Sequence, residues 1–336
     1  MDFATVDHDV DVPIVEVEKQ KGSEENVAKH HSRAAYLIMD LHYSSNREEV
    51  LIQLDNFIKQ PRSESMRINL GYYLWKSFNT VNRSESMRIG LGYHLWNLFD
   101  TVYILLQEVA AVYQKFLDST LTLKESARVC NALTVFQCMA SHPDARKWLV
   151  KEKVQDYLYP FLQITPNVML PLQLLRLSIF NFIDALTKFD ELHGHEILLL
   201  FLDTQIFSSC VNCIRDGDKP IKKAATLILM KILMQEEGLR YCCSRPDDFL
   251  SVIRILCQLV RSFSYQIPCS QHLKYVVQCF LSLLRVAWED RVYETVRDML
   301  PLQLIENTFR NIIHKDPEIP EMLHQLVWNL NHRPPQ

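Results

Sequence analysis

Hydrophobic residues recur every three or four positions along most of this chain, which is the spacing of one face of an α-helix. In residues 46–60, NREEVLIQLDNFIKQ, one side of such a helix collects Val50, Leu51, Leu54, Phe57 and Ile58. Asn46 stands before the first turn as an N-cap, and Pro61 follows the last. We therefore predict an amphipathic helix here.

The same spacing continues toward the C-terminal end, interrupted by short turns that contain Pro, Asp or Gly. It predicts further helices over residues 34–45, 99–116, 122–141, 171–189, 195–216, 219–243, 246–263, 271–288, 290–301 and 321–332. Residues 142–164 contain a proline-bounded break and predict two shorter helices. Several segments are apolar on two faces, as in the inner layer of stacked helices. Units of roughly 40 residues with two or three helices each predict an all-α solenoid.

The two ends of the chain differ from this pattern. Residues 1–33 are rich in acidic side chains and have no helical period, so we predict a disordered acidic tail. A short alternation there, VPIVEVE, has no partner strand in the sequence. Residues 332–336 form a short C-terminal tail, which leaves residues 34–331 for the solenoid.

One stretch is present twice. RSESMRINLGYYLWKSFNTVN at residues 62–82 is followed directly by RSESMRIGLGYHLWNLFDTVY at residues 83–103, and 15 of the 21 positions are identical. A shift of 21 residues turns an ideal helix about 60° out of register, so both copies cannot share one continuous buried stripe. The Arg-Ser-Glu-Ser at residues 83–86 supplies a turn and a cap between them. The duplication is consistent with an added helix, a loosely packed loop or a duplicated partner site.

Composition and charge narrow the class of protein. Hydrophobic residues make up 48% of the 336 residues, charged residues 23%, and there are 7 glycines, which favours helices over turn-rich β structure. The formal net charge is -4, and the acidic tail accounts for all of it. A nucleic acid therefore gains no attraction from the whole domain, although a local groove that gathers Lys188, Lys222, Lys223, Arg254 and Arg261 stays open as an alternative.

The chain has no uncharged apolar run of about 18 residues, and its acidic start does not resemble a signal peptide. We expect a soluble intracellular protein with no membrane partner. The 9 cysteines are an odd number scattered among apolar residues, which indicates reduced core thiols, including Cys210 and Cys213 of a CxxC.

The sequence contains no glycine-rich phosphate loop, GxSxG, HExxH or paired Asp-x-Asp cluster. His193 and His195 form an HxH, but no third metal ligand accompanies them. We therefore expect no catalytic residues, no metal and no cofactor, and a protein that is not an enzyme.

Five blocks carry a resemblance to a known family. They are RVCNALTVFQCMASHPDAR at 128–146, LYPFLQ at 158–163, LRLSIFNFIDALTKFDE at 175–191, KAATLILMKIL at 223–233 and EGLRYCC at 237–243. Together with residues 34–54, these blocks resemble the Rcd family ("required for cell differentiation"), which supplies the armadillo-repeat subunit of the CCR-NOT deadenylase complex. The resemblance implies an armadillo-type α-solenoid, a right-handed superhelix of stacked two- and three-helix repeats.

The resemblance also implies a function. Members of the family are non-enzymatic adaptors that dock on the Not scaffold subunit and bind short peptide motifs of RNA-binding or silencing proteins. They thereby direct mRNA deadenylation, decay and translational repression, in the cytoplasm including P-bodies and also in the nucleus. The family fold permits weak nucleic-acid binding and a homodimer. A degenerate paralogue that has lost complex association is the alternative.

The family has the LW.SF.T helix once, so one copy of the duplicated stretch is extra. The second copy is the one joined to ILLQEV. Family members place small residues after this helix, along a peptide groove. Here the resemblance assigns to the candidate groove Trp96, Phe99, Asp100, Tyr103, Asn181 and Asp184. A carboxylate and a phenol are expected to obstruct an apolar peptide.

Two further sets follow from the resemblance. Phe249 and Arg291 match a region that binds tryptophan in the family, but Asp247 and Asp248 stand beside Phe249 where the family has other residues. His142, Tyr159, Pro160 and Arg176 follow family motifs as scaffold contacts or as structural residues. Because the altered positions fall in the groove, we expect scaffold docking to persist better than peptide capture.

Overall fold

The computed structural model describes residues 36–37, 39–41, 43, 46–59, 89–90, 92–93, 95–97, 100–163, 169–265, 267–285, 290–306, 309, 312 and 316–332. Every regular element within these residues is helical, which confirms the predicted all-α class. The predicted tail at residues 1–33 and the first copy of the duplicated stretch lie outside the described residues.

The helices are α2 (Arg47–Lys59), α5 (Thr101–Ala110), α6 (Tyr113–Leu117), α7 (Leu123–Met139), α8 (Pro143–Lys151), α9 (Leu170–Leu186), α10 (Gly194–Leu202), α11 (Ile206–Asp216), α12 (Lys219–Met234), α13 (Glu236–Ser244), α14 (Pro246–Ser262), α15 (Ser270–Leu284), α16 (Asp290–Met299) and α18 (Glu318–Asn331). Three short 3-10 helices are η1 (Val154–Tyr157), η2 (Tyr159–Leu162) and η3 (Leu302–Leu304). The described residues between 89 and 97 are also helical.

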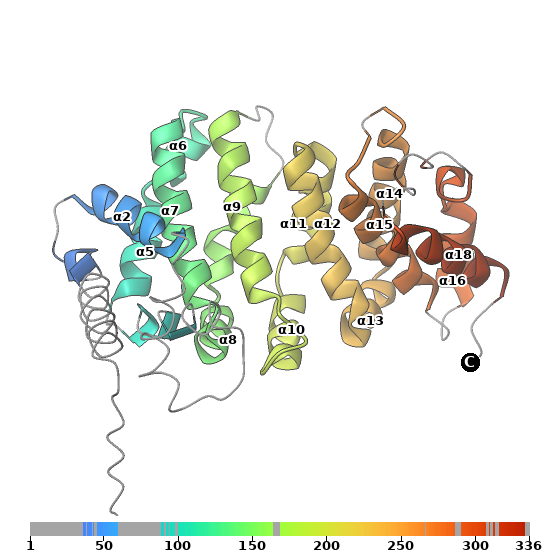
Figure 1. Cartoon of the computed structure of the whole chain (residues 1–336), viewed down its shortest axis with the longest axis horizontal. Coiled ribbons are helices and arrows are strands. Elements are labelled where there is room, and N and C mark those ends of the chain that lie inside the picture. The colour runs from blue at the N-terminus through green and yellow to red at the C-terminus, as the bar shows by residue number, and fades with distance from the viewer. Residues whose placement is uncertain are drawn as a thin grey trace, which may run out of the picture.

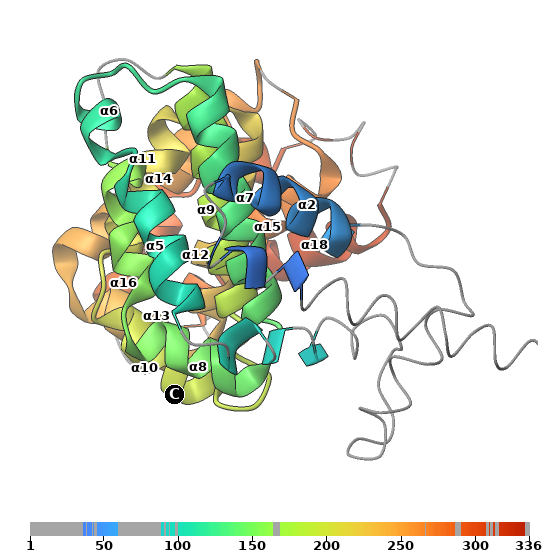
Figure 2. The same ribbon diagram turned by 90° about the vertical axis from the view of Figure 1, so that its left-hand side faces the viewer.

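The helices stack along one axis as repeats (Figure 1). Helix α10 packs on α13, α11 on α14 and α12 on α15, so each helix of one three-helix unit meets its equivalent in the next. An inner row, defined as α2, α7, α9, α12, α15 and α18, runs the length of the molecule with each helix against the next. In Figure 2, α2, α15 and α18 of the inner row lie on one side, and α5, α10, α13, α14 and α16 lie on the other. The predicted solenoid is confirmed, while the hand of its superhelix stays a prediction.

Hydrogen bonds between repeats show the period directly. The Cys130 thiol donates to the carbonyl of Leu174, 44 residues on. The hydroxyl groups of Tyr159 and Thr204 are 2.8 Å apart and 45 residues apart in sequence. A repeat of about 45 residues is slightly longer than predicted and falls within the range of armadillo and HEAT units. These bonds tie one unit to the next.

Local signals explain where the helices begin. Thr122 caps α7, because its hydroxyl accepts the Glu125 amide while the Glu125 carboxylate accepts the Thr122 amide. Asp218 caps α12 by accepting the amide of Ile221 at 3.1 Å. The predicted cap at Asn46 is confirmed as well, since its side-chain oxygen accepts the amide of Glu49 at 3.4 Å.

Three predicted single helices are wrong, because each is two helices in the structure. Residues 195–216 divide into α10 and α11, residues 219–243 into α12 and α13, and residues 99–116 contain α5 and α6. After α10, the hydroxyl of Thr204 donates to the carbonyl of Phe201 at 2.7 Å, which satisfies a carbonyl at the bend. Both helices at each of the first two breaks bury apolar residues, so the hydrophobic spacing does not reveal the turn.

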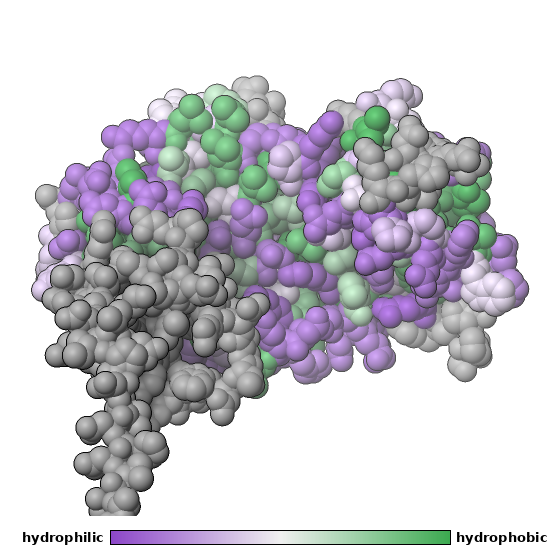
Figure 3. Space-filling view, in the orientation of Figure 1, coloured by the Kyte–Doolittle hydropathy of each residue, from purple (hydrophilic) through white to green (hydrophobic). Residues whose placement is uncertain are grey.

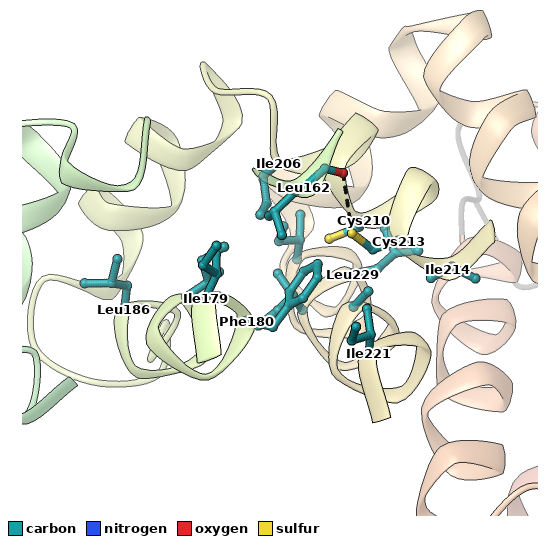
Figure 4. Close-up of a cluster of buried hydrophobic side chains, with 14 of the residues drawn as sticks. Leu162, Ile179, Phe180, Leu186, Ile206, Cys210, Cys213, Ile214, Ile221 and Leu229 are labelled. Atoms are coloured by element: carbon teal, nitrogen blue, oxygen red, sulfur yellow. Dashed lines mark hydrogen bonds between the residues drawn. The ribbon is translucent and has the colours of Figure 1, made fainter. Parts of the chain in front are cut away.

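No single described helix is long and apolar enough to cross a bilayer, although α10 and α11 reach that length and composition together, with a bend of 74° between them. Both helices contribute to the core. Figure 4 shows Ile206, Cys210, Cys213 and Ile214 of α11 among buried side chains of neighbouring helices. The prediction of buried thiols is confirmed for Cys210 and Cys213, which are free and buried, and the Cys213 thiol donates to the carbonyl of Leu162 at 3.5 Å. It is wrong for Cys269, which is exposed.

A buried histidine joins α12 to α15. His272 is 6% exposed, and its Nε2 lies 3.3 Å from the hydroxyl of Thr226. That hydroxyl donates to the carbonyl of Lys222 at 2.7 Å, so the imidazole donates to it. Burial, with the charges of Lys223 and Lys222, lowers the pKa of His272 to about 4. The folded chain therefore holds this imidazole neutral.

We expect the chain to lose stability as the pH falls from 7 toward 4. The unfolded chain protonates His272 near its ordinary pKa of about 6.5, whereas the folded chain resists protonation until about 4. The stability from this residue is present above pH 6.5, and its loss amounts to roughly 2–3 kcal/mol by pH 4. Urea unfolding at pH 7 and pH 4.5 measures it. His272→Gln should lose less free energy of unfolding between pH 7 and pH 4.5 than the wild-type chain. An equal loss in both proteins would contradict the assignment.

Candidate functional site

The inner row carries a charged pair at its centre. On α9, Asn181 is exposed and Asp184 points toward α12, where Lys231 Nζ lies 2.6 Å from Asp184 Oδ1. The two side chains remain partly exposed, at 42% for Asp184 and 27% for Lys231. We call Asp184 and Lys231 the central ion pair. The predicted groove residues Asn181 and Asp184 thus share one surface, and that surface is polar.

Tyr275 on α15 borders the central ion pair. Burial, followed by the negative charge of Asp184, raises the pKa of the Tyr275 phenol. The phenol therefore stays protonated and neutral. On the face shown in Figure 3, hydrophilic residues cover much of the middle of the solenoid, and hydrophobic residues gather in small groups. An apolar peptide laid along the middle of this face would have to remove water from charged groups.

A second surface lies where the helical residues 89–97 meet α8. The rings of Tyr93 and Trp96 lie 5.0 Å and 6.2 Å from that of His142, and Trp96 lies 6.5 Å from Trp148. Burial lowers the pKa of His142, so a neutral imidazole stacks between the aromatic rings. Trp96 is partly buried against the core here. Among the predicted groove residues, Trp96 therefore contacts α8, whereas Asp184 contacts α12.

Asp100 directly precedes α5. Asp100 is exposed and left-handed, with φ of 67°, a conformation that Asp and Asn adopt more readily than most residues. Tyr103 is 62% exposed on the first turn of α5. Phe99 lies outside the described residues. Asp100 and Tyr103 are therefore surface residues that a partner can reach.

The predicted tryptophan-binding region falls on α14 and α16, which pack together. Phe249 is buried, while Arg291 is exposed at the start of α16. Sequence reasoning missed the neighbouring Arg245, whose guanidinium lies 4.2 Å above the ring of Tyr241. Tyr241 in turn stacks on Phe207 at 5.7 Å. Arg245 lies between α13 and α14, four residues after Tyr241, and the sequence has no other signal of a cation over this aromatic face.

Two of the residues predicted as scaffold or structural contacts are buried. Tyr159 is buried and hydrogen-bonded to Thr204. Arg176 is 1% exposed, and its Nε donates to the carbonyl of Phe161 at 2.8 Å. Pro160 is exposed and His142 is half-buried, so these two remain able to contact a partner.

A buried arginine also escaped the sequence prediction. Arg146 on α8 is fully buried, and its Nη2 lies 2.7 Å from the carboxylate of Glu191 in the turn before α10. Burial favours the neutral form of the Glu191 carboxyl group. The hydrogen bonds from Lys188 and Arg146 outweigh this effect and lower the pKa of Glu191. The signal was present, because Arg146 falls on the same helical face as the buried Leu149 and Val150. This pair joins one repeat to the next.

The residues considered for metal or nucleic-acid binding do not come together in one site. His193 lies 3.0 Å from Asp144, whereas His195 lies 3.6 Å from Glu237, and the described residues hold no group of three metal-ligating side chains. Of the basic residues, Lys222 and Lys223 are on α12, while Arg254 and Arg261 are on α14 in another row. The remaining one, Lys188, follows α9 and pairs with Glu191 at 3.1 Å.

Comparisons with known proteins extend over most of the chain. Residues 37–330 match the model of the "Cell differentiation family, Rcd1-like". The chain is 33% identical to "Cell differentiation protein rcd1" of Schizosaccharomyces pombe over 298 residues, which cover 88% of this chain and 92% of that protein. It is 30% identical to "Protein CAF40" of Saccharomyces cerevisiae over 294 residues, 88% of this chain and 70% of that protein.

Proposed function

Because the chain belongs to the Rcd1-like cell differentiation family, we propose that it is a non-enzymatic adaptor subunit of the CCR-NOT complex. In this role it docks on the Not scaffold and binds short peptide motifs, thereby directing mRNA deadenylation, decay and translational repression. The proposal places it in the cytoplasm, including P-bodies, and in the nucleus.

The observation that carries this proposal is the extent of the family match. Residues 37–330 span the solenoid from its first described helical residues into α18. An armadillo-type solenoid offers long surfaces on which a helical partner or an extended peptide can lie. Such surfaces bind partners through apolar anchors and rigid aromatic side chains.

Calorimetry with the full chain and the helical docking region of the Not scaffold tests the proposal. We expect one-to-one binding with a Kd in the micromolar range or tighter. A folded sample that shows no binding would remove the adaptor role and favour a paralogue that has left the complex.

The peptide-binding part of the proposal has its own prediction. The central ion pair is partly exposed, so replacing it in Asp184→Ala/Lys231→Met should change the free energy of unfolding by no more than about 1 kcal/mol. The variant should bind an amphipathic helical peptide more tightly than the wild-type chain does, since no charge is desolvated. Fluorescence anisotropy with a labelled peptide measures this, and equal affinities would show that the peptide lies elsewhere.

A further inference from the structure

The described helical residues between 89 and 97 fit closely against α7 and α8. Gly92 meets the end of α7 so closely that a Cβ there would lie 2.3 Å from the carbonyl oxygen of Cys138 and 3.2 Å from the Cα of Met139. Tyr93 and Trp96 contact His142, and Trp96 also lies beside Trp148. We call Cys138, Met139, His142 and Trp148 the helix seat. A side chain at this position would force the helix away from the backbone of Cys138 and Met139.

The chain contains a second segment with the same seat-facing residues. Twenty-one positions earlier, Gly71 corresponds to Gly92, and Tyr72 corresponds to Tyr93. Leu74 corresponds to the fully buried Leu95, and Trp75 corresponds to Trp96. The buried Thr101 at the start of α5 likewise corresponds to Thr80. The first copy therefore has every side chain that the described contacts with the seat require.

The described positions at which the copies differ are mostly exposed. The second copy has Asn97, Asp100 and Tyr103 there, all exposed, where the first has Lys76, Asn79 and Asn82. Asn79 also suits the left-handed backbone of Asp100, since asparagine adopts positive φ readily. The exception is Gly90, which is buried and corresponds to Asn69. An amide at this position is costly to bury, so the second copy is favoured.

We propose that the helix seat accepts either copy, so that residues 68–75 of the same chain can replace residues 89–96. With the second copy seated, the extra residues precede the seated helix. With the first copy seated, the extra 21 residues follow it and separate the seat from the rest of α5. The exchange is independent of the proposed adaptor function, because it rests on the seat contacts and the duplicated sequence alone.

Exchange would change the chemistry of the surface beside the seat. A neutral Asn97 gives way to the cationic Lys76, and the anionic Asp100 gives way to the neutral Asn79. The phenol of Tyr103 gives way to the amide of Asn82. The exposed surface thus becomes more positive and less aromatic without any covalent modification. One chain would then present two alternative surfaces to a partner.

A pair of matched substitutions tests the exchange. Gly92→Leu blocks the second copy, Gly71→Leu blocks the first, and the double variant blocks both. The urea midpoint of the full chain is measured for each, with sedimentation velocity to give its oligomeric state. Gly71→Leu should leave the midpoint unchanged. Gly92→Leu should lower it by less than half of the shift in the double variant, and the protein should stay monomeric.

Other results would overturn the proposal. If Gly92→Leu is as damaging as the double variant, or does not fold, the first copy cannot take the seat. If the double variant is as stable as the wild-type chain, the seat does not depend on these glycines. A dimer of Gly92→Leu would mean that the first copy of another chain is the occupant. As a second measurement, a chain that lacks residues 83–103 should fold, with a midpoint close to that of a chain that lacks residues 62–82.

Discussion

Replacing Arg176 with alanine is expected to lower the free energy of unfolding by about 3 kcal/mol. The guanidinium is 1% exposed and donates from Nε to the carbonyl of Phe161 and from Nη2 to that of Gln163. The substitution leaves a cavity under α9 and removes the donors from both carbonyls, one of them in a fully buried residue. Urea unfolding followed by circular dichroism measures the loss.

Arg254→Ala is the control for this prediction, because it removes the same side chain from an exposed position on α14. It should change the free energy of unfolding by no more than about 0.5 kcal/mol. A loss below 1 kcal/mol in Arg176→Ala, together with lost binding to the Not scaffold, would instead make Arg176 a partner contact. The experiment thus separates the two roles that the family resemblance leaves open.

Gly194→Ala is expected to cost about 3 kcal/mol as well, for a different reason. A Cβ at this position would lie 1.8 Å from the carbonyl oxygen of Phe189 and 2.4 Å from its carbonyl carbon. Both atoms belong to the backbone, so relief requires α10 to move away from the turn that precedes it. That turn also carries Glu191, the partner of the buried Arg146, and the movement would disturb this ion pair.

Thermal and urea unfolding of Gly194→Ala measure this cost. Leu199→Ala on the same helix is the matched control, because Leu199 is exposed and its truncation should change stability by no more than about 0.5 kcal/mol. A stable Gly194→Ala protein would show that the close approach of α10 to Phe189 is not required for folding.

The fold followed from the sequence because its strongest signals are local. Helical spacing predicted the segments that became α7, α9 and α14, and the caps at Asn46 and Thr122 marked where helices begin. The breaks at Thr204 and Gln235 were missed, since both helices on either side are apolar and the period continues across the turn. These turns are held by contacts between repeats, such as the bond from Tyr159 to Thr204, which lie 45 residues apart.

Less of the candidate site could be predicted from the sequence. Resemblance placed Asn181 and Asp184 on one face, and the structure shows them there, but nothing in the sequence revealed that Lys231 neutralises Asp184 from the next repeat. Likewise, Tyr159 and Arg176 occur in family motifs, and the sequence did not reveal that both are buried. Charge pairing and burial depend on residues 45 or so positions away, and a linear pattern does not record such distances.

Because each repeat of the solenoid packs mainly on its neighbours, a duplicated segment can be retained in evolution without disturbing distant repeats. Among the described elements, the main packing contacts join a repeat only to the one before or after it. The duplication falls ahead of α5, near the N-terminal end, where its second copy contacts α7 and α8. Between α9 and α12, the same insertion would have separated two central repeats. Near the end of the solenoid, the duplication changes the packing of one repeat and leaves the packing of the others intact. Natural selection can then act on the duplicated segment while the rest of the protein stays folded.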